Sequence, residues 1–252
     1  MLEIFILSLI QGITEFIPVS SSSHLILFSD YINFDNKSLS IDVSLHIGSF
    51  LAVTTYFYKE ILNFFKNKEL FFKIILSSTP VMISGFILVK TNLIDNLRII
   101  EIIGWTTLLF GILLFISDKF NLEKNLKKDF NYKFALIVGI FQVLSLIPGV
   151  SRSGIVITAA RFLNFNRVDS AKLSFLLSIP TLAAVSIFGI NKHVEFQDLN
   201  FSLLNLFSIL FSFIISLLTI KFFLKYIKNF SLKIFVVYRV LLGTIILFFV
   251  YL

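Results

Sequence analysis

The sequence contains no cysteine, and it has few charged residues for its length. Without cysteine the chain can form neither disulfides nor thiolate metal sites, so it does not reveal the redox state of its compartment. Charged side chains make up 15% of the 252 residues, whereas hydrophobic side chains make up 57%. This is more apolar surface than a soluble domain can bury. The composition therefore predicts a protein that crosses a membrane several times.

Signals for secretion and for nucleic-acid binding are also weak. The N-terminal stretch has no basic region and no small-residue cleavage site, and it carries Glu3, so we expect no removable signal peptide. The net charge of +7 comes largely from lysines in short runs between apolar segments. Such runs are typical of cytoplasmic loops in membrane proteins. We therefore expect contact with membrane lipids and no nucleic-acid partner.

Each half of the chain contains one broken apolar run and three continuous ones. Pro18 and a block of serines interrupt the first run, residues 2–28, and Pro148-Gly149 interrupts the run at 134–163. Irregular backbone is tolerated at membrane depth only where protein or trapped water surrounds it, so both runs predict hairpins that enter the membrane and return. The continuous runs predict six spanning helices. They are Val43–Tyr58, Phe71–Val89, Ile99–Ile116, Ala171–Ile190, Phe201–Phe223 and Leu232–Tyr251.

The two halves also match residue by residue. Pro18 and Pro148, Ser21 and Ser151, and Ser44 and Ser174 are 130 positions apart, and Gln11 and Gln142 are 131 apart. These offsets predict one membrane domain, residues 1–252, with two repeats at about 1–117 and 132–252. Three spans per repeat is an odd number, so the second repeat should be inverted, and the basic loops agree with that orientation. We thus expect an all-α polytopic protein of two inverted repeats, each a re-entrant hairpin plus three transmembrane helices.

Inverted hairpins enter from opposite sides and meet near the middle, which predicts that Glu15 and Arg152 lie together. In the first hairpin Gln11 and Glu15 share a helical face. After the Pro18 break the serines at 20–23 begin a second helix, and His24 follows within its first turn. Backbone N–H groups and hydroxyls at such a helix start can converge on an anion.

The second hairpin offers complementary groups. Gly149 permits a tight turn, and Arg152 carries a planar guanidinium that matches phosphate oxygens. Two opposed helix N-termini and an arginine favour a doubly negative ligand, for which a diphosphate is the natural candidate. The predicted phosphate-binding residues are Ser20, Ser22, Ser151, Ser153 and Gly154.

Phosphoryl transfer needs a nucleophile, a base and positive groups for the charge on the equatorial oxygens. Arg152 and the amides supply the positive groups. The nucleophile is His24, Ser21 or a water activated by Glu15, and the pattern does not choose among them. Gln11 and Glu15 offer the hard oxygen ligands that Mg²⁺ or Ca²⁺ prefer.

Structural roles compete with these functional ones. Glu15 can serve as a structural partner of Arg152, although its place beside an arginine and a histidine favours function. Lone serines in membrane helices usually pack or form hydrogen bonds between helices. Arg239, near the start of the last apolar run, is expected to extend its side chain to the interface.

The same residues resemble the undecaprenyl-diphosphate phosphatase family, also called bacitracin-resistance proteins. The first motif matches at Gln11 and Glu15, then at Phe16-Ile17-Pro18-Val19-Ser20-Ser21 and His24; the second matches at Pro148-Gly149-Val150-Ser151-Arg152-Ser153-Gly154. Two positions depart from the family pattern. Ser22-Ser23 stand where Thr-Gly is usual, which bears on the shape of the turn because glycine allows backbone angles that serine resists. Val156 stands where Thr or Ser is frequent.

The resemblance implies hydrolysis of undecaprenyl diphosphate, a C55 isoprenyl diphosphate, to undecaprenyl phosphate and inorganic phosphate. This reaction recycles the lipid carrier for peptidoglycan synthesis and confers bacitracin resistance. It also implies interlocked inverted repeats in the bacterial inner membrane, a site towards the periplasm, dependence on a divalent cation, and a homodimer. Glu15, Ser21, His24 and Arg152 look like the family's catalytic set.

Two other classes compete with this enzyme. Inverted repeats with broken helices are typical of secondary transporters, so a transporter or lipid flippase is the main alternative. The membrane acid-phosphatase superfamily also has serine–histidine and serine–arginine segments. Its upstream Lys-x6-Arg-Pro motif and its downstream histidine four residues before an aspartate are missing here.

Overall fold

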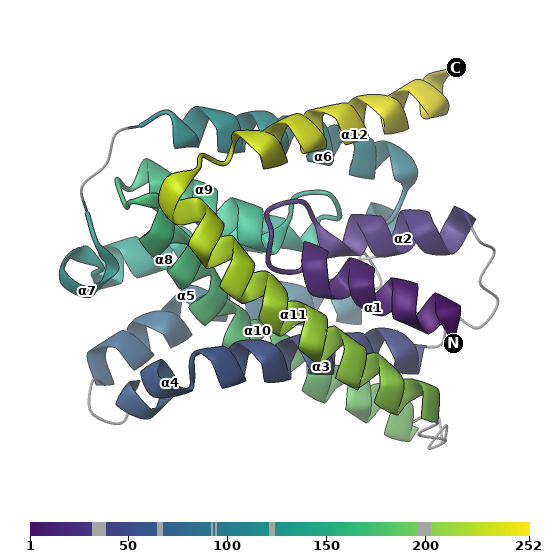
Figure 1. Cartoon of the computed structure of the whole chain (residues 1–252), viewed down its shortest axis with the longest axis horizontal. Coiled ribbons are helices and arrows are strands. Elements are labelled where there is room, and N and C mark those ends of the chain that lie inside the picture. Colours follow the sequence, from purple (N-terminus) through teal and green to yellow (C-terminus); the bar gives the residue numbers. More distant parts are fainter. Residues whose placement is uncertain (32–38, 65–67, 92, 94, 121–123, 196–202) are drawn as a thin grey trace.

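The computed structural model describes residues 1–31, 39–64, 68–91, 93, 95–120, 124–195 and 203–252, and every element in these ranges is a helix (Figure 1). The α-helices are α1 Leu2–Thr14, α2 Ser21–Tyr31, α3 Leu39–Tyr56, α4 Tyr58–Phe64, α5 Lys68–Lys90, α6 Ile100–Asp118, α7 Leu126–Asp129, α8 Tyr132–Val143, α9 Arg152–Phe162, α10 Arg167–Glu195, α11 Leu203–Asn229 and α12 Lys233–Tyr251. Two 3₁₀ helices, η1 Asp95–Leu97 and η2 Leu144–Leu146, complete the set. The all-α prediction is confirmed.

Among the described residues, five helices are long and apolar enough to cross a membrane: α5, α6, α10, α11 and α12. They match five of the six predicted spans and confirm a multi-pass membrane protein. The remaining prediction, Val43–Tyr58, corresponds to α3, which is not among the five. This helix packs against α10 and α11, and it buries Val43, Ser44 and Ser49. A helix enclosed by other helices can carry polar residues that a lipid-facing helix cannot.

Both predicted hairpins are broken where the sequence indicated. Helix α1 has 13 residues, a rise of about 20 Å, which is shorter than a hydrocarbon core of about 30 Å. Residues 15–20 form the first turn and residues 147–151 the second; α2 and α9 follow them. Ser20 and Ser151, each directly before the next helix, have positive φ angles of 80° and 71°. By backbone conformation Ser151 therefore corresponds to Ser20, whereas the offset of 130 positions in the sequence matches it to Ser21.

The turns of the two hairpins lie near the middle of the helical assembly, and α1 and α2 run from there to its edge (Figure 1). Helix α1 packs against α11 and α3, and α9 packs against α10, α8 and α6. Helix α12 runs beside α6 and so covers the side on which α9 lies. The loops at 32–38 and 196–202, which contribute to the predicted orientation, lie outside the described residues.

Candidate active site

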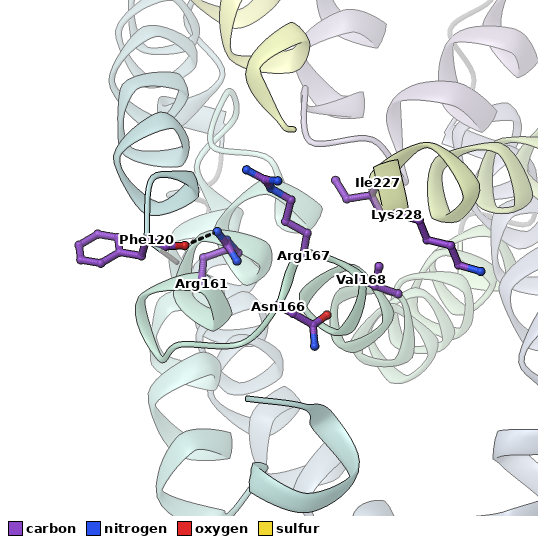
Figure 2. Close-up of a pocket in the computed structure, with 7 residues that line it drawn as sticks. All are labelled: Phe120, Arg161, Asn166, Arg167, Val168, Ile227 and Lys228. Carbon is purple, nitrogen blue, oxygen red and sulfur yellow. Dashed lines mark hydrogen bonds between the residues drawn. The ribbon is translucent and has the colours of Figure 1, made fainter. Parts of the chain in front are cut away.

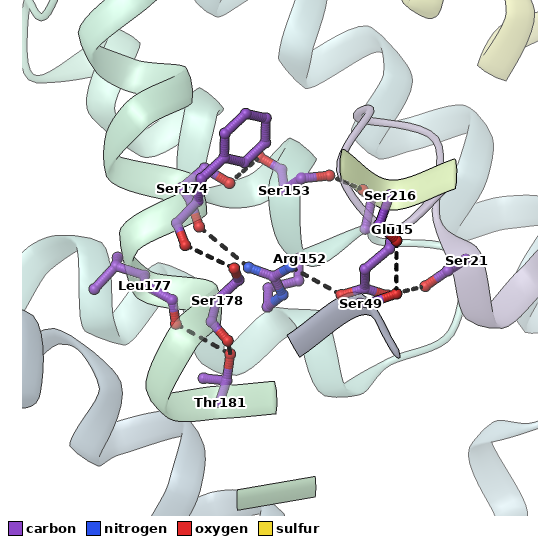
Figure 3. Close-up of polar contacts among 12 residues, drawn as sticks. Glu15, Ser21, Ser49, Arg152, Ser153, Ser174, Leu177, Ser178, Thr181 and Ser216 are labelled. Atoms are coloured by element: carbon purple, nitrogen blue, oxygen red, sulfur yellow. Dashed lines mark hydrogen bonds and ion pairs between the residues drawn. The ribbon is translucent and has the colours of Figure 1, made fainter. Parts of the chain in front are cut away.

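Glu15 and Arg152 meet where the two hairpins cross (Figure 3). Arg152 begins α9, and its Nη2 donates a hydrogen bond to Glu15 Oε1 at 2.8 Å across 137 positions of sequence. Glu15 directly follows α1, and its side chain is 7% exposed, against 13% for Arg152. The predicted pairing of the acid with the arginine is therefore confirmed.

The second oxygen of Glu15 receives two further donors. Ser21 Oγ donates to Glu15 Oε2 at 2.7 Å (Figure 3). Gln11 Nε2 lies 3.2 Å from the same oxygen and 3.5 Å from Ser49 Oγ on α3. Donors from α1, α2 and α9 therefore fix the orientation of this carboxylate. Arg152 has a second contact, from Nη1 to the Ser174 carbonyl at 3.2 Å.

The serines at the two helix starts hold the turns in shape. Ser20 Oγ lies 3.0 Å from Ser23 Oγ and 3.3 Å from Ser22 Oγ. Ser22 and Ser23 both lie in regular helix, so the usual glycine's freedom is not needed there, and the positive φ falls on Ser20. Such a φ costs a non-glycine residue about 1–2 kcal/mol, which the surrounding structure must offset.

In the second hairpin Ser151 caps α9 by accepting a hydrogen bond from the Gly154 N–H at 3.1 Å. Ser153 Oγ lies 3.2 Å from Ser151 Oγ and donates to the Ile17 carbonyl of the first turn at 2.8 Å. Two predicted phosphate-binding groups, the Gly154 N–H and the Ser153 hydroxyl, are thus engaged within the turns.

His24 lies beside this centre without touching Glu15 or Arg152 in the described part of the chain. Its Nδ1 is 2.6 Å from the Ser20 carbonyl, and its Nε2 is 2.6 Å from the Tyr238 hydroxyl of α12. Because a carbonyl only accepts, Nδ1 must carry a proton. In the neutral ring Nε2 therefore accepts the hydrogen bond from Tyr238, and the imidazole must leave Tyr238 to use that lone pair.

Two residues of α12 at this site were not predicted. Tyr238 was not identified at all, and the prediction that Arg239 extends to the interface is wrong. Arg239 has 0% exposure, and its guanidinium lies against main-chain carbonyls of both turns. With two guanidiniums and one carboxylate, the crossing carries an excess positive charge that favours an anionic ligand.

The residues predicted to hold a divalent cation provide a small set of oxygen donors. No group of three or more His, Asp or Glu side chains suited to a metal occurs among the residues that the structure describes. Gln11 Oε1 is buried and has no hydrogen-bond partner within those residues, and it belongs to the amide beside Glu15. This carbonyl oxygen and the carboxylate fit a hard cation that takes its other ligands from phosphate oxygens.

A cavity of about 290 Å³ lies at another part of the molecule (Figure 2). Its lining residues are Phe120, Arg161, Asn166, Arg167, Val168, Ile227 and Lys228. None of them belongs to the predicted site. This cavity adjoins a second acid–arginine centre, in which Asp118 binds Arg161 and Arg167.

Comparison with known proteins gives a consistent result. Three relatives named undecaprenyl-diphosphatase come from Pelagibacter ubique (strain HTCC1062), Aliivibrio salmonicida (strain LFI1238) and Jannaschia sp. (strain CCS1), with 46%, 39% and 35% identity. Each alignment covers at least 97% of this chain and at least 96% of the relative. The model of the family described as bacitracin resistance protein BacA matches residues 4–245. Since this match contains both hairpins and the whole crossing, the chain belongs to the BacA family of bacitracin resistance proteins.

Proposed function

We propose that this protein hydrolyses undecaprenyl diphosphate to undecaprenyl phosphate and inorganic phosphate. The observation that carries the proposal is the contact between Glu15 and Arg152, with Ser21 on the same carboxylate. It places a base, a hydroxyl and a cation at one point, which is what phosphoryl transfer requires. The relatives' shared name, undecaprenyl-diphosphatase, supplies the substrate.

Arg152 binds the terminal phosphate in this proposal. Within the described residues, protein acceptors engage one hydrogen bond each from its Nη1 and Nη2. The remaining face of the guanidinium can take phosphate oxygens in a fork geometry. Its charge then stabilises the negative charge that spreads over the equatorial oxygens in the transition state.

Ser21 is the nucleophile that the geometry favours. Its hydroxyl already donates to Glu15 at 2.7 Å, which is the nucleophile–base contact expected of an activated hydroxyl. Glu15 takes the proton as Ser21 Oγ bonds to the terminal phosphorus, and the bond from that phosphorus to the bridging oxygen breaks. Undecaprenyl phosphate leaves with the bridging oxygen. Water then attacks the phosphorus and the bond from phosphorus to Ser21 Oγ breaks. Glu15 returns its proton to Ser21 Oγ, and phosphate departs with both protons of the water.

We further propose that Mg²⁺ or Ca²⁺ assists, held by Gln11, Glu15 and the diphosphate. When bound, such a cation would neutralise charge on the diphosphate. His24 is available for proton transfer once Nε2 leaves Tyr238. Ser20, Ser22, Ser151, Ser153 and Gly154 remain the proposed phosphate contacts, which requires their hydrogen bonds within the turns to rearrange.

The biological setting follows the same reasoning. The proposal places the protein in the bacterial inner membrane with its site towards the periplasm, as the basic loops support. There it would recycle the lipid carrier for peptidoglycan synthesis and confer bacitracin resistance. The inverted arrangement of the two repeats and a homodimer belong to the same proposal.

The test is phosphate release from a C55 or C15 isoprenyl diphosphate by purified protein in detergent, with Mg²⁺ or Ca²⁺ present. We expect turnover by the wild type and none by Arg152→Ala that elutes and unfolds like the wild type. Absence of release by the wild type would rule out the enzyme, and equal release by the variant would place the site elsewhere.

A further inference from the structure

Arg239 is the largest fully buried side chain among the described residues, and the charge it carries has no obvious counter-charge. Its exposure is 0%, and no carboxylate of the described chain lies within 4.0 Å of it. Burying an ionised group without compensation is costly, so a retained arginine needs other partners. Main-chain carbonyls supply them.

The carbonyls come from both reactive turns at once. Arg239 Nη1 donates to the Pro18 carbonyl of the first turn at 3.2 Å and to the Val150 carbonyl of the second at 3.1 Å. Nη2 donates to the Gly149 carbonyl at 2.8 Å, and Nε donates to the Thr107 carbonyl of α6 at 3.2 Å. One rigid guanidinium therefore joins the two turns and α6.

The carbonyls of Pro18, Gly149 and Val150 need a donor because the helices are interrupted there, whereas Thr107 lies within α6. Inside a membrane no bulk water satisfies them, so protein groups must do so. Pro18 lies three residues from both Glu15 and Ser21, and Gly149 lies three residues from Arg152. The guanidinium thus binds each turn within three residues of the reacting side chains.

Two glycines leave the space that the Arg239 side chain occupies. A Cβ atom added at Gly111 of α6 would lie 2.9 Å from Arg239 Cβ, and one added at Gly154 of α9 would lie 2.9 Å from Arg239 Nη1. Both glycines allow the side chain to pass between α6 and α9. Lysine can replace the charge but not the fork that reaches several carbonyls at once.

We propose that Arg239 is a positioning residue that sets the distance between Arg152 and the Glu15–Ser21 pair by fixing the two turns to one another. It acts through these residues and does not touch the substrate. The inference rests on the proposed hydrolysis, because the alignment it explains is that of the residues proposed to carry out this reaction.

The test compares Arg239→Lys with the wild type in the phosphate-release assay, per molecule of folded protein. Misplacement of reacting groups by about 1 Å costs about a hundredfold in rate, so we expect kcat to fall about a hundredfold while KM changes less than about threefold. Unchanged kcat in folded Arg239→Lys would overturn the inference while leaving the hydrolysis intact. Inactive wild type would instead refute the hydrolysis.

A double-mutant cycle separates positioning from general loosening. If Arg239 acts by aligning Arg152, Arg239→Lys should cost much less in an Arg152→Lys background than in the wild type, because the aligned interaction is already impaired. Equal losses in both backgrounds would show that Arg239 acts independently of Arg152 and would overturn the inference.

A second pair of variants covers the case in which Arg239→Lys does not fold. Gly111→Ala pushes on the Arg239 side chain, whereas Gly243→Ala crowds the same α6–α12 interface at Leu108, also at 2.9 Å. We expect both to lower the unfolding temperature and only Gly111→Ala to lower kcat, by about tenfold or more. Equal kcat in the two variants would overturn the inference.

Discussion

Two acid–arginine centres, at Glu15 and at Asp118, lie in the described part of the molecule, and they differ in which groups bind the acid. At Asp118 both carboxylate oxygens bind Arg167, from Nε at 2.6 Å and from Nη2 at 3.0 Å, and Oδ2 also accepts from the Leu232 N–H at 3.1 Å. Arg161 adds an ion pair at 3.6 Å and donates to the carbonyls of Phe165 and Phe120. This centre joins the end of α6 to the starts of α10 and α12.

At Glu15 one guanidinium nitrogen contacts Oε1, and the Ser21 hydroxyl and the Gln11 amide contact Oε2. The arginine keeps donor capacity, and the hydroxyl is a potential nucleophile. A buried acid–arginine pair is therefore not by itself a sign of catalysis. The difference lies in whether the geometry leaves groups able to bind and react with a ligand.

Replacing Ser21 with alanine should give the largest effect on activity. If Ser21 is the nucleophile, kcat/KM for phosphate release should fall by about 10⁴-fold or more, as it does when a nucleophile is removed. Ser29→Ala, which changes a buried serine two turns further along α2, is the matched control and should retain activity. A loss below about a hundredfold in Ser21→Ala would make Ser21 a positioning group and leave water or His24 as the nucleophile.

The Glu15–Arg152 centre is called the open centre, because its arginine and hydroxyl can still bind or react with a ligand. Changing Glu15 to glutamine tests this centre with an almost isosteric substitution. We expect kcat/KM to fall about 10³-fold, because the proton acceptor is lost. Stability should change by less than about 2 kcal/mol, because Arg152 at 13% exposure keeps its hydrogen bond to the Ser174 carbonyl. The rate should be measured over a titration of Mg²⁺. Recovery at high Mg²⁺ would show that the carboxylate acts through the cation alone and would contradict the role of proton acceptor.

The same chemical change at the Asp118 centre, called the closed centre, should lower stability and leave activity nearly unchanged. Asp118→Asn leaves Arg161, whose side chain is 4% exposed, without its counter-charge, so we expect a loss of about 3–5 kcal/mol of unfolding free energy. Denaturant unfolding in detergent measures it. Turnover per folded molecule should stay close to that of the wild type. If Asp118→Asn were stable and inactive, the distinction between the two centres would fail.

The sequence predicted the open centre because its residues are chemically distinctive. Pro18 and Pro148 mark the breaks, and the placement of the two hairpins across from one another predicted the contact between Glu15 and Arg152. Arg239 could not be recognised in this way, because its acceptors are main-chain carbonyls, which every residue has. Position along the chain also does not reveal that α12 turns this side chain inwards and that α3 is enclosed by other helices.

The smallest predicted effect is on the histidine beside the open centre. Tyr238→Phe removes the hydroxyl that holds His24 Nε2 and keeps the ring that stacks on the imidazole with centroids 5.7 Å apart. A net hydrogen bond is worth about 1 kcal/mol, so the free imidazole should become available more easily and kcat should change by at most about fivefold. Tyr226→Phe, whose hydroxyl binds the Ser231 carbonyl away from the crossing, is the control. If Tyr238→Phe abolished turnover while Tyr226→Phe did not, the hydroxyl would itself take part in the reaction, and the open centre would extend from Glu15 through His24 to α12.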